Sequence, residues 1–183
     1  ERNGLHLKTS PIKGTRPSGQ SGKFSDKDIA ENIMIVDLMR NDLGRICVQD
    51  SVQAESLLRT EELPGLAHLV SDVIGILKPG MHWSDIFAAT LPPGSVSGAP
   101  KFSAIKIIDK YERINRGPYC GAFGWIHGER AKLAVAIRTF WSDGSAVKFG
   151  TGAGITWSSD PIGEWKETEL KANRLIAIAN GEL

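Results

Sequence analysis

The sequence lacks the features that mark membrane-spanning, zinc-binding and disulfide-rich proteins. No stretch approaches the roughly 18 to 20 apolar residues that cross a bilayer, and only two of the 183 residues are cysteines. Cys47 and Cys120 lie far apart and form neither a CxxC pair nor a Cys/His spacing typical of zinc. We therefore expect no membrane partner, no disulfide framework and no zinc, and we take a reducing, cytoplasmic setting as the default.

An excess of charge of one sign is also absent, because 22 Lys and Arg residues accompany 21 Asp and Glu residues. The basic residues between positions 8 and 23 are not interleaved with aromatic residues, so we expect no nucleic-acid partner. The segment 19–23 is not a P-loop, since Pro17 stands at the first glycine position and Phe24 replaces the required Ser or Thr. The composition is that of a compact enzyme domain.

Local patterns predict a mixed α+β chain. Strands are expected over residues 5–9, 68–77, 120–127, 132–141 and 146–150, the last three as an antiparallel meander that turns at 142–144. Helices are expected from Ser25 onward, over 83–90, from the end of a 92–100 loop to about 112, and from Asp160-Pro161 to about 180. Ser25 and Asp28 nearly form a capping box, and Ile29, Ile33 and Val36 lie on one face of that helix.

The segment Pro11-Ile12-Lys13-Gly14-Thr15 places a lysine in what we interpret as a rigid, glycine-opened turn. An amine held in a partly dry pocket can lose its proton and act as a nucleophile. A solvated loop lysine is the alternative interpretation of the same residues.

Two predicted helices each carry a pair of carboxylates three residues apart, Asp28 with Glu31 and Glu164 with Glu167. Each pair projects from one helical face, and four carboxylates brought together would need a divalent cation such as Mg²⁺. The alternative is two solvated faces, with Glu167 and Lys171 as an ion pair four residues apart.

Three further positions admit both a functional and a structural interpretation. Arg138, on a predicted strand, is either a simple surface charge or a clamp for a carboxylate through its planar guanidinium. The run Gly152–Gly154 either bends the chain at a sheet corner or lets backbone N–H groups approach a ligand. His68, at the start of a predicted strand, is either structural or a proton-transfer group.

Five collinear blocks resemble the chorismate-utilising enzymes. They are PIKGTRPSG at 11–19, ENIMIVDLMRNDLGR at 31–45, HLVSDVIGIL at 68–77, LPPGSVSGAPKFSAIKIID at 91–109 and GAGITWSSDPIGEWKETELK at 152–171. The resemblance implies a large antiparallel sheet with flanking helices, truncated at its N-terminus. It also implies that residues 1–183 are the C-terminal portion of a chorismate-binding catalytic domain.

The resemblance assigns roles to individual residues. It implies that Lys13 and His68 are catalytic and that the substrate contacts Thr15, Ser95, Tyr119, Arg138, Gly152, Ala153, Gly154 and Lys171. Glu31 and Glu167 match direct Mg²⁺ ligands, while Asp28 and Glu164 match a second pair that reaches the metal through water. The family commonly has Glu at the position of Asp28.

Within this family, Lys13 points to one reaction. PIKGT is the pattern of aminodeoxychorismate synthases, whose lysine attacks chorismate beside its carboxylate-bearing carbon, with Mg²⁺ on the ring carboxylate. Ammonia from a partner or fused glutamine amidotransferase then displaces the lysine, giving the precursor of p-aminobenzoate. Three alternatives stay open: an anthranilate synthase, which generally has PIAGT; an isochorismate-type synthase, whose upstream lysine is lacking here; and a non-catalytic fragment or interaction module.

Overall fold

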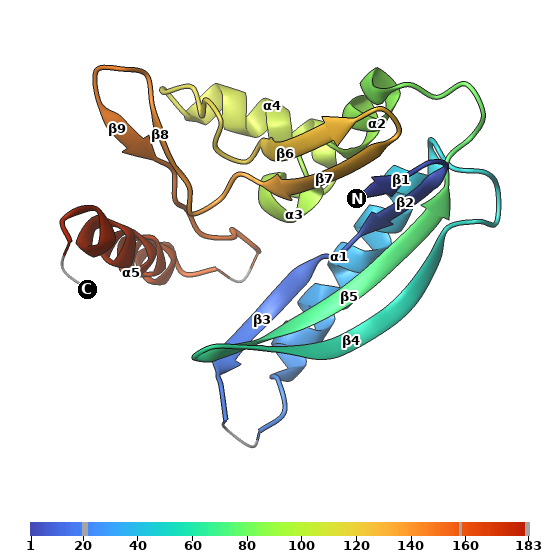
Figure 1. Cartoon of the computed structure of the whole chain (residues 1–183). Helices are drawn as coiled ribbons and strands as arrows, with labels where there is room; N and C mark the ends of the chain where they lie inside the picture. The colour runs from blue at the N-terminus through green and yellow to red at the C-terminus, as the bar shows by residue number, and fades with distance from the viewer. Residues whose placement is uncertain (20–21, 158, 182–183) are drawn as a thin grey trace.

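The computed structural model describes residues 1–19, 22–157 and 159–181, which form nine strands and five helices (Figure 1). The strands are β1 (Arg2–Asn3), β2 (His6–Thr9), β3 (Ile12–Pro17), β4 (Gln53–Leu63), β5 (Leu66–Ile76), β6 (Ala122–His127), β7 (Arg130–Val135), β8 (Phe140–Ser142) and β9 (Val147–Phe149). The helices are α1 (Asp26–Gly44), α2 (Trp83–Thr90), α3 (Gly94–Ser97), α4 (Lys101–Tyr111) and α5 (Pro161–Ala179). No helix in the described ranges is long and apolar enough to cross a membrane.

Seven strands form one antiparallel sheet, in the order β3-β5-β2-β1-β7-β6, with β4 on the other edge of β5. Strands β2 and β3 follow each other along the same edge of β5, where Thr9 pairs with Val73 and Ile12 with Val70. The mixed α/β class, with a large antiparallel sheet and flanking helices, is therefore confirmed.

Helix α1 packs lengthwise on the sheet and begins where the sequence predicts (Figure 1). The Ser25 hydroxyl accepts from the backbone N–H of Asp28 at 3.1 Å, and the Asp28 carboxylate accepts from the Ser25 N–H at 3.2 Å, which completes a capping box. The buried face differs in part from the prediction, since Val36 is buried as expected but Ile33 is 44% exposed, and Ile35 and Met39 are buried instead. The buried stripe is thus rotated around the helix.

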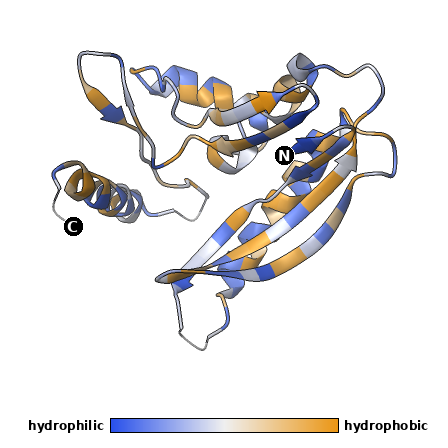
Figure 2. Ribbon diagram, viewed as in Figure 1, coloured by the Kyte–Doolittle hydropathy of each residue, from blue (hydrophilic) through white to orange (hydrophobic). Residues whose placement is uncertain are grey.

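The main hydrophobic core lies between α1, α2 and the sheet. Its members are Leu7, Ile35, Val36, Met39, Leu43, Ile46, Cys47, Val73, Leu77, Ile86 and Ala89. Figure 2 shows hydrophobic residues on α4 and α5 as well, yet α4 buries no residue and α5 buries only Leu175 among its described residues. The apolar side chains of α5 are therefore mostly exposed.

One prediction about the strands is wrong, a second is correct except that the strand begins two residues earlier, and one strand was not predicted. Lys13 lies in β3 rather than in a turn, where the pairing with β5 shifts register between Ile12 and Thr15. His68 is the third residue of β5, because a hairpin joins β4 to β5 and lengthens the strand toward its start. Strand β4 itself was not predicted, since its charged, exposed residues give no apolar alternation.

The predicted three-stranded meander is also wrong. Strand β7 ends at Val135, and β8 and β9 form a separate two-stranded sheet. Arg138 therefore lies between strands and has a left-handed backbone with φ +50°, which is unusual for a residue other than glycine. The loop predicted over 92–100 contains the short helix α3. The beginning of α5 is confirmed, with Asp160 as N-cap and Pro161 as its first residue.

Candidate functional site

A cavity of about 720 Å³ contains many of the residues that the sequence analysis selected. The predicted residues that line it are Lys13, Ser95, Tyr119, Arg138, Gly152, Ala153, Gly154 and Lys171. They come from β3, α3, α5 and three connecting segments, so distant parts of the chain meet at one place. A cavity of this size accommodates a small organic molecule.

Cationic side chains dominate the charge of this cavity. Arg2, Lys8, Lys13, Arg138 and Lys171 line it together with two carboxylates, Glu1 and Asp42. The carboxylate of Asp42 is already paired, since Lys101 Nζ lies 2.7 Å from its Oδ2. Four of the five cations also have a carboxylate partner, namely Glu129 for Arg2, Glu55 for Lys8, Glu31 for Lys13 and Glu167 for Lys171. The lining favours a small anionic ligand that takes the place of these partners.

Lys13 is held between β3 and α1. Its Nζ lies 3.6 Å from Glu31 Oε2, and both side chains are about one-third exposed. The next residue, Gly14, has φ +88°, and a Cβ there would lie 3.0 Å from Asp28 Cβ. Glycine is thus required for β3 to approach the start of α1 closely, and this approach fixes the position of the lysine.

Tyr119 packs on the glycine-rich segment that follows β9. A Cβ on Gly150 would lie 2.3 Å from the Tyr119 ring, and one on Gly152 would lie 3.3 Å from the hydroxyl. Burial, followed by the neighbouring Cys120, raises the pKa of Tyr119 to about 12. The phenol therefore stays neutral at physiological pH and can donate a hydrogen bond into the cavity.

Lys171 connects α5 to the same glycine-rich segment. Its Nζ donates to the carbonyl oxygen of Gly152 at 3.2 Å and to Glu167 Oε1 at 2.5 Å. The pair with Glu167 is the i, i+4 ion pair that the sequence left as the alternative to a metal site.

The four predicted metal ligands are not gathered into one cluster. Asp28 caps α1, Glu31 pairs with Lys13, and Glu164 accepts from Ser159 Oγ at 2.6 Å. Over residues 1–19, 22–157 and 159–181, no three His, Cys, Asp or Glu side chains lie close enough together to hold a metal ion. This arrangement does not fit a single Mg²⁺ ion bound by both carboxylate pairs.

Thr15 and His68 form a separate pair outside the lining of the cavity. They are cross-strand partners on β3 and β5, and Thr15 Oγ1 lies 2.9 Å from His68 Nδ1. The sequence analysis selected both residues but did not predict their contact, which depends on strand register.

Sequence reasoning missed several polar groups in the cavity wall, and Asp42 is the most buried of them. Asp42 is 3% exposed and lies on the buried face of α1, one turn after Met39. Lys101 at the start of α4 reaches both Asp42 and the carbonyl oxygen of Ala89, at 2.7 and 2.9 Å. A carboxylate within an apolar helical stripe is the signal that identifies such a buried pair.

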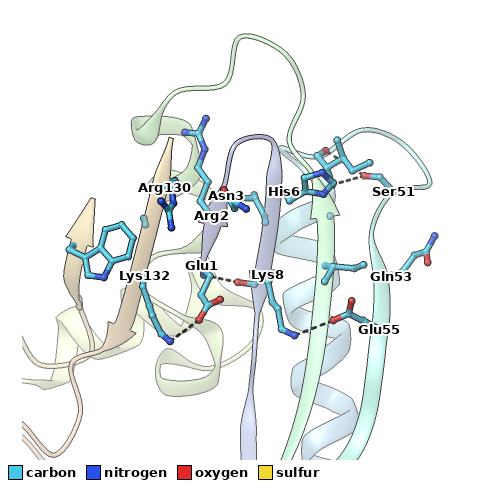
Figure 3. Close-up of a pocket in the computed structure, with 16 residues that line it drawn as sticks. Glu1, Arg2, Asn3, His6, Lys8, Ser51, Gln53, Glu55, Arg130 and Lys132 are labelled. Atoms are coloured by element: carbon cyan, nitrogen blue, oxygen red, sulfur yellow. Dashed lines mark hydrogen bonds and ion pairs between the residues drawn. The ribbon is translucent and has the colours of Figure 1, made fainter. Parts of the chain in front are cut away.

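A second cavity, of about 680 Å³, lies beside β1, β2 and β7 (Figure 3). Its charged groups are largely paired, since Lys132 Nζ lies 3.2 Å from Glu1 Oε1 and Lys8 Nζ lies 3.1 Å from Glu55 Oε2. None of the predicted catalytic, substrate-binding or metal-binding residues lines this cavity. The first cavity is therefore the candidate active site.

Known proteins share both the sequence and the fold of this chain. The family of chorismate binding enzymes matches residues 1–177. Anthranilate synthase component 1 of Saccharolobus solfataricus is 42% identical over 92% of this chain and 43% of its own length. Aminodeoxychorismate synthase component 1 of Salmonella typhimurium is 38% identical over 93% of this chain and 40% of its own.

A solved structure supports the fold as well. Anthranilate synthase component I from Streptococcus pneumoniae aligns with a TM-score of 0.81 and 34% identity, over 95% of this chain and 40% of that one. The chain thus spans about two fifths of the length of the relatives that it matches. From the matched family, the collinear blocks and this shared fold, we conclude that the chain belongs to the chorismate binding enzymes.

Proposed function

We propose that this chain carries the chorismate-aminating site of an aminodeoxychorismate synthase, with Lys13 as a covalent nucleophile. The observation that carries the proposal is that Lys13 lines one cationic cavity together with Arg138 and Lys171. Chorismate is a small dianion, and a guanidinium and an ammonium suit its two carboxylates.

The reaction requires two displacements. The neutral amine of Lys13 attacks the ring carbon next to the carboxylate-bearing carbon, the double bonds shift, and the hydroxyl group leaves from across the ring with a proton. Ammonia then attacks the carbon that lost the hydroxyl, the double bonds shift back, and the bond to Lys13 breaks. The product carries its amino group para to the carboxylate, and the lysine is regenerated.

Ammonia is the second substrate in this proposal. The matched relatives from Saccharolobus and Salmonella are both named component 1, which supports a second component that supplies ammonia. We propose a glutamine amidotransferase subunit or fused domain for that role. Free ammonium replaces it in the experiment below.

Anthranilate synthase is the second candidate. Relatives with this name reach 42% identity, compared with 38% for the aminodeoxychorismate synthase relative. In that case ammonia attacks the ring directly, beside the carboxylate-bearing carbon, and the product is ortho-substituted. The residue at position 13 separates the two candidates, because only the para reaction needs a protein amine.

Mg²⁺ remains part of the proposal on the strength of the family resemblance. The two carboxylate pairs lie on separate helices and are engaged with Ser25, Lys13, Ser159 and Lys171. Binding of Mg²⁺ would require these contacts to exchange. Calorimetric titration with MgCl₂ tests this directly, and the double variant Glu31→Gln/Glu167→Gln should lose the binding.

The decisive experiment is to incubate the chain with chorismate, MgCl₂ and ammonium at alkaline pH and to identify the product by chromatography. We expect 4-amino-4-deoxychorismate, and we expect Lys13→Ala to reduce its formation by roughly 10³-fold or more. Lys23→Ala, which changes an exposed lysine ten residues away, is the matched control.

Each other outcome has a defined meaning. An ortho product moves the chain to the anthranilate synthases, and unchanged para product from Lys13→Ala refutes the covalent step. Absence of both turnover and chorismate binding in a folded, monodisperse sample supports the non-catalytic alternative.

A further inference from the structure

The lysine proposed as nucleophile lies in a β-bulge. The register of β3 against β5 shifts between Ile12 and Thr15. Lys13 and Gly14 on β3 therefore lie opposite a single residue of β5, Leu69. A bulge of this kind bends its strand and turns side chains in new directions, and bulges are frequent beside active sites. The direction of the Lys13 side chain thus depends on what holds the bulge in place.

A buried asparagine of α1 contacts β5 directly opposite this bulge. Asn32 is 0% exposed, and its Nδ2 donates to the carbonyl oxygen of Leu69 at 3.0 Å. Burial of an amide costs free energy unless hydrogen bonds within the protein replace those to water. The preceding residue is Glu31, whose Oε2 lies 3.6 Å from Lys13 Nζ. The amide therefore fastens α1 to β5 at the place where the helix meets the bulge.

A buried serine extends the network to both strands that flank β5. Ser71 is 0% exposed, and its Oγ donates to Asn32 Oδ1 at 2.6 Å. The same oxygen accepts from the backbone N–H of Leu58 at 2.9 Å, within a second register shift in β4. The backbone N–H of Ser71 donates to the carbonyl oxygen of Pro11, just before β3, at 3.1 Å. Two buried side chains thus join the irregular parts of β3 and β4 to β5 and α1.

The segment held in this way forms part of the candidate active site. Pro11, Ile12 and Lys13 line the cavity, whereas Asn32 and Ser71 do not. An attacking amine must lie within about 3 to 3.5 Å of its target atom, and a misplacement of about 1 Å can cost a factor of about 10² in rate. The groups proposed to bind the substrate carboxylates come from other elements. A change in the bulge should therefore slow attack more than it weakens binding.

We propose that Asn32 and Ser71 are positioning residues, which hold the β3 bulge so that Lys13 presents its amine to the cavity. This inference rests on the proposed function, because only the covalent step makes the reaction rate depend on the position of that amine. A purely structural role would lower the stability of variants but leave Lys13 in the same place in the molecules that remain folded.

The surroundings of Lys13 are measured in the complete chain without substrate. ¹H–¹³C correlation spectra of protein labelled with [ε-¹³C]lysine report on each lysine, and Lys13→Ala identifies the signal of Lys13. Asn32→Leu, which has a similar volume but no donor or acceptor, should shift this signal by more than its linewidth. The signal of Lys132, a largely exposed residue of β7, should stay unchanged. Asn41→Leu, on an exposed asparagine of the same helix, is the matched control and should move neither signal.

A second variant removes only one hydroxyl and disturbs the fold less. Ser71→Ala should shift the Lys13 signal in the same direction as Asn32→Leu but by a smaller amount. Circular dichroism confirms that each variant is folded before its spectrum is compared. An unchanged Lys13 signal in the folded variants overturns the proposal.

Activity provides a second, independent readout. With wild-type turnover established, Asn32→Leu should lower kcat roughly tenfold or more and change KM less than about twofold. Ser71→Ala should lower kcat less, and Asn41→Leu should leave it unchanged. An increase in KM at unchanged kcat would also overturn the proposal. If the wild type fails to convert chorismate, the proposed function fails, while the spectra still decide whether Asn32 and Ser71 position Lys13.

Discussion

Two regions of this chain have very different interiors. The N-terminal region, residues 1–90, supplies every member of the main hydrophobic core. The C-terminal region, residues 91–181 without the undescribed residue 158, has only Cys120, Ala131, Ala136 and Leu175 as buried hydrophobic residues. Large side chains such as Phe102, Trp157 and Trp165 are more than 60% exposed there. The stability of this protein is therefore concentrated in the first region.

The candidate active site lies where these two regions meet. Lys13 comes from the well-packed N-terminal region, whereas Tyr119, Arg138 and Lys171 come from the C-terminal region. The proposed nucleophile thus has a rigid support, and the proposed carboxylate-binding groups stand on elements with few buried contacts. Loss of order in the C-terminal region should therefore weaken substrate binding more than it disturbs the position of the nucleophile.

The largest expected effect is on the free energy of unfolding, when a Leu→Ala substitution in the N-terminal region is compared with one in the C-terminal region. Leu77 is 1% exposed in the core, and Leu170 on α5 is 72% exposed. Leu77→Ala should lower the free energy of unfolding by about 3 kcal/mol, because it removes buried methyl groups and leaves a cavity. Leu170→Ala should change it by less than about 0.5 kcal/mol.

Chemical denaturation followed by circular dichroism measures both variants. Thr60→Val serves as a surface control in the N-terminal region. Equal losses for Leu77→Ala and Leu170→Ala would show that the C-terminal region is as well packed in solution as the core, which would remove the contrast between the regions.

The next effect tests the contribution of the C-terminal region to the site. Arg138→Ala should weaken chorismate binding by about 2 kcal/mol, roughly 30-fold in Kd, because a charge-assisted hydrogen bond to a carboxylate is lost. Arg130→Ala is the matched control, since Arg130 lines the second cavity and not the first. Isothermal titration calorimetry compares the three proteins, and equal affinities would exclude Arg138 from the binding site.

Local signals in the sequence predicted the elements that are stabilised locally. The Ser25 capping box and the Asp160-Pro161 start of α5 are both confirmed, because a cap needs only residues within one turn. The β4–β5 hairpin and the end of β7 depend on pairing between strands instead. Strand β4 is rich in exposed charged residues, so its sequence does not indicate that it pairs with β5. The residues just after Val135 are also apolar, so the sequence does not indicate where the chain leaves the sheet.

The candidate site shows the same division. The motifs selected Lys13, Arg138 and Lys171, which meet at the cavity although they lie up to 158 positions apart. They could not show that Thr15 faces His68, since the register shift in β3 decides that contact. Nor could helical spacing show whether two carboxylate pairs on different helices meet, because this depends on how α1 and α5 pack.

The next prediction compares a shielded ion-pair network with an exposed ion pair, and its expected effect on the free energy of unfolding is smaller. Asp72 in β5 is 5% exposed and contacts Ser10, Lys8 and Arg59. Burial acts to raise the pKa of Asp72, but the hydrogen bonds from Ser10, Arg59 and Lys8 outweigh it and hold the pKa below its ordinary value. Asp72→Asn should cost about 1 kcal/mol near pH 7, a value limited by the partial exposure of both cations.

The pH dependence of this variant follows from the direction of the shift. A lowered carboxyl pKa means that folding favours the ionised form, so its contribution is complete above the ordinary pKa of about 3.9. It is lost as the pH falls through the folded-state value. Denaturation near pH 7 and near pH 3 should therefore show a gap between wild type and Asp72→Asn that narrows in acid. Asp143→Asn, which breaks the exposed contact with Lys148 in the C-terminal region, should show a smaller gap near pH 7.

The smallest effect concerns Tyr119, one of the few shielded polar groups of the C-terminal region. Its pKa is raised to about 12, chiefly by burial, so the folded state favours the neutral phenol. The stabilisation is complete below the ordinary value of about 10 and is lost as the pH rises through the folded value. In a Tyr111→Phe background, Tyr119 is the only phenol, and its ultraviolet absorbance should report ionisation near pH 12. Ionisation near the ordinary pKa of about 10 would mean that water reaches Tyr119. The loose packing of the C-terminal region would then include the part of the cavity wall that Tyr119 forms.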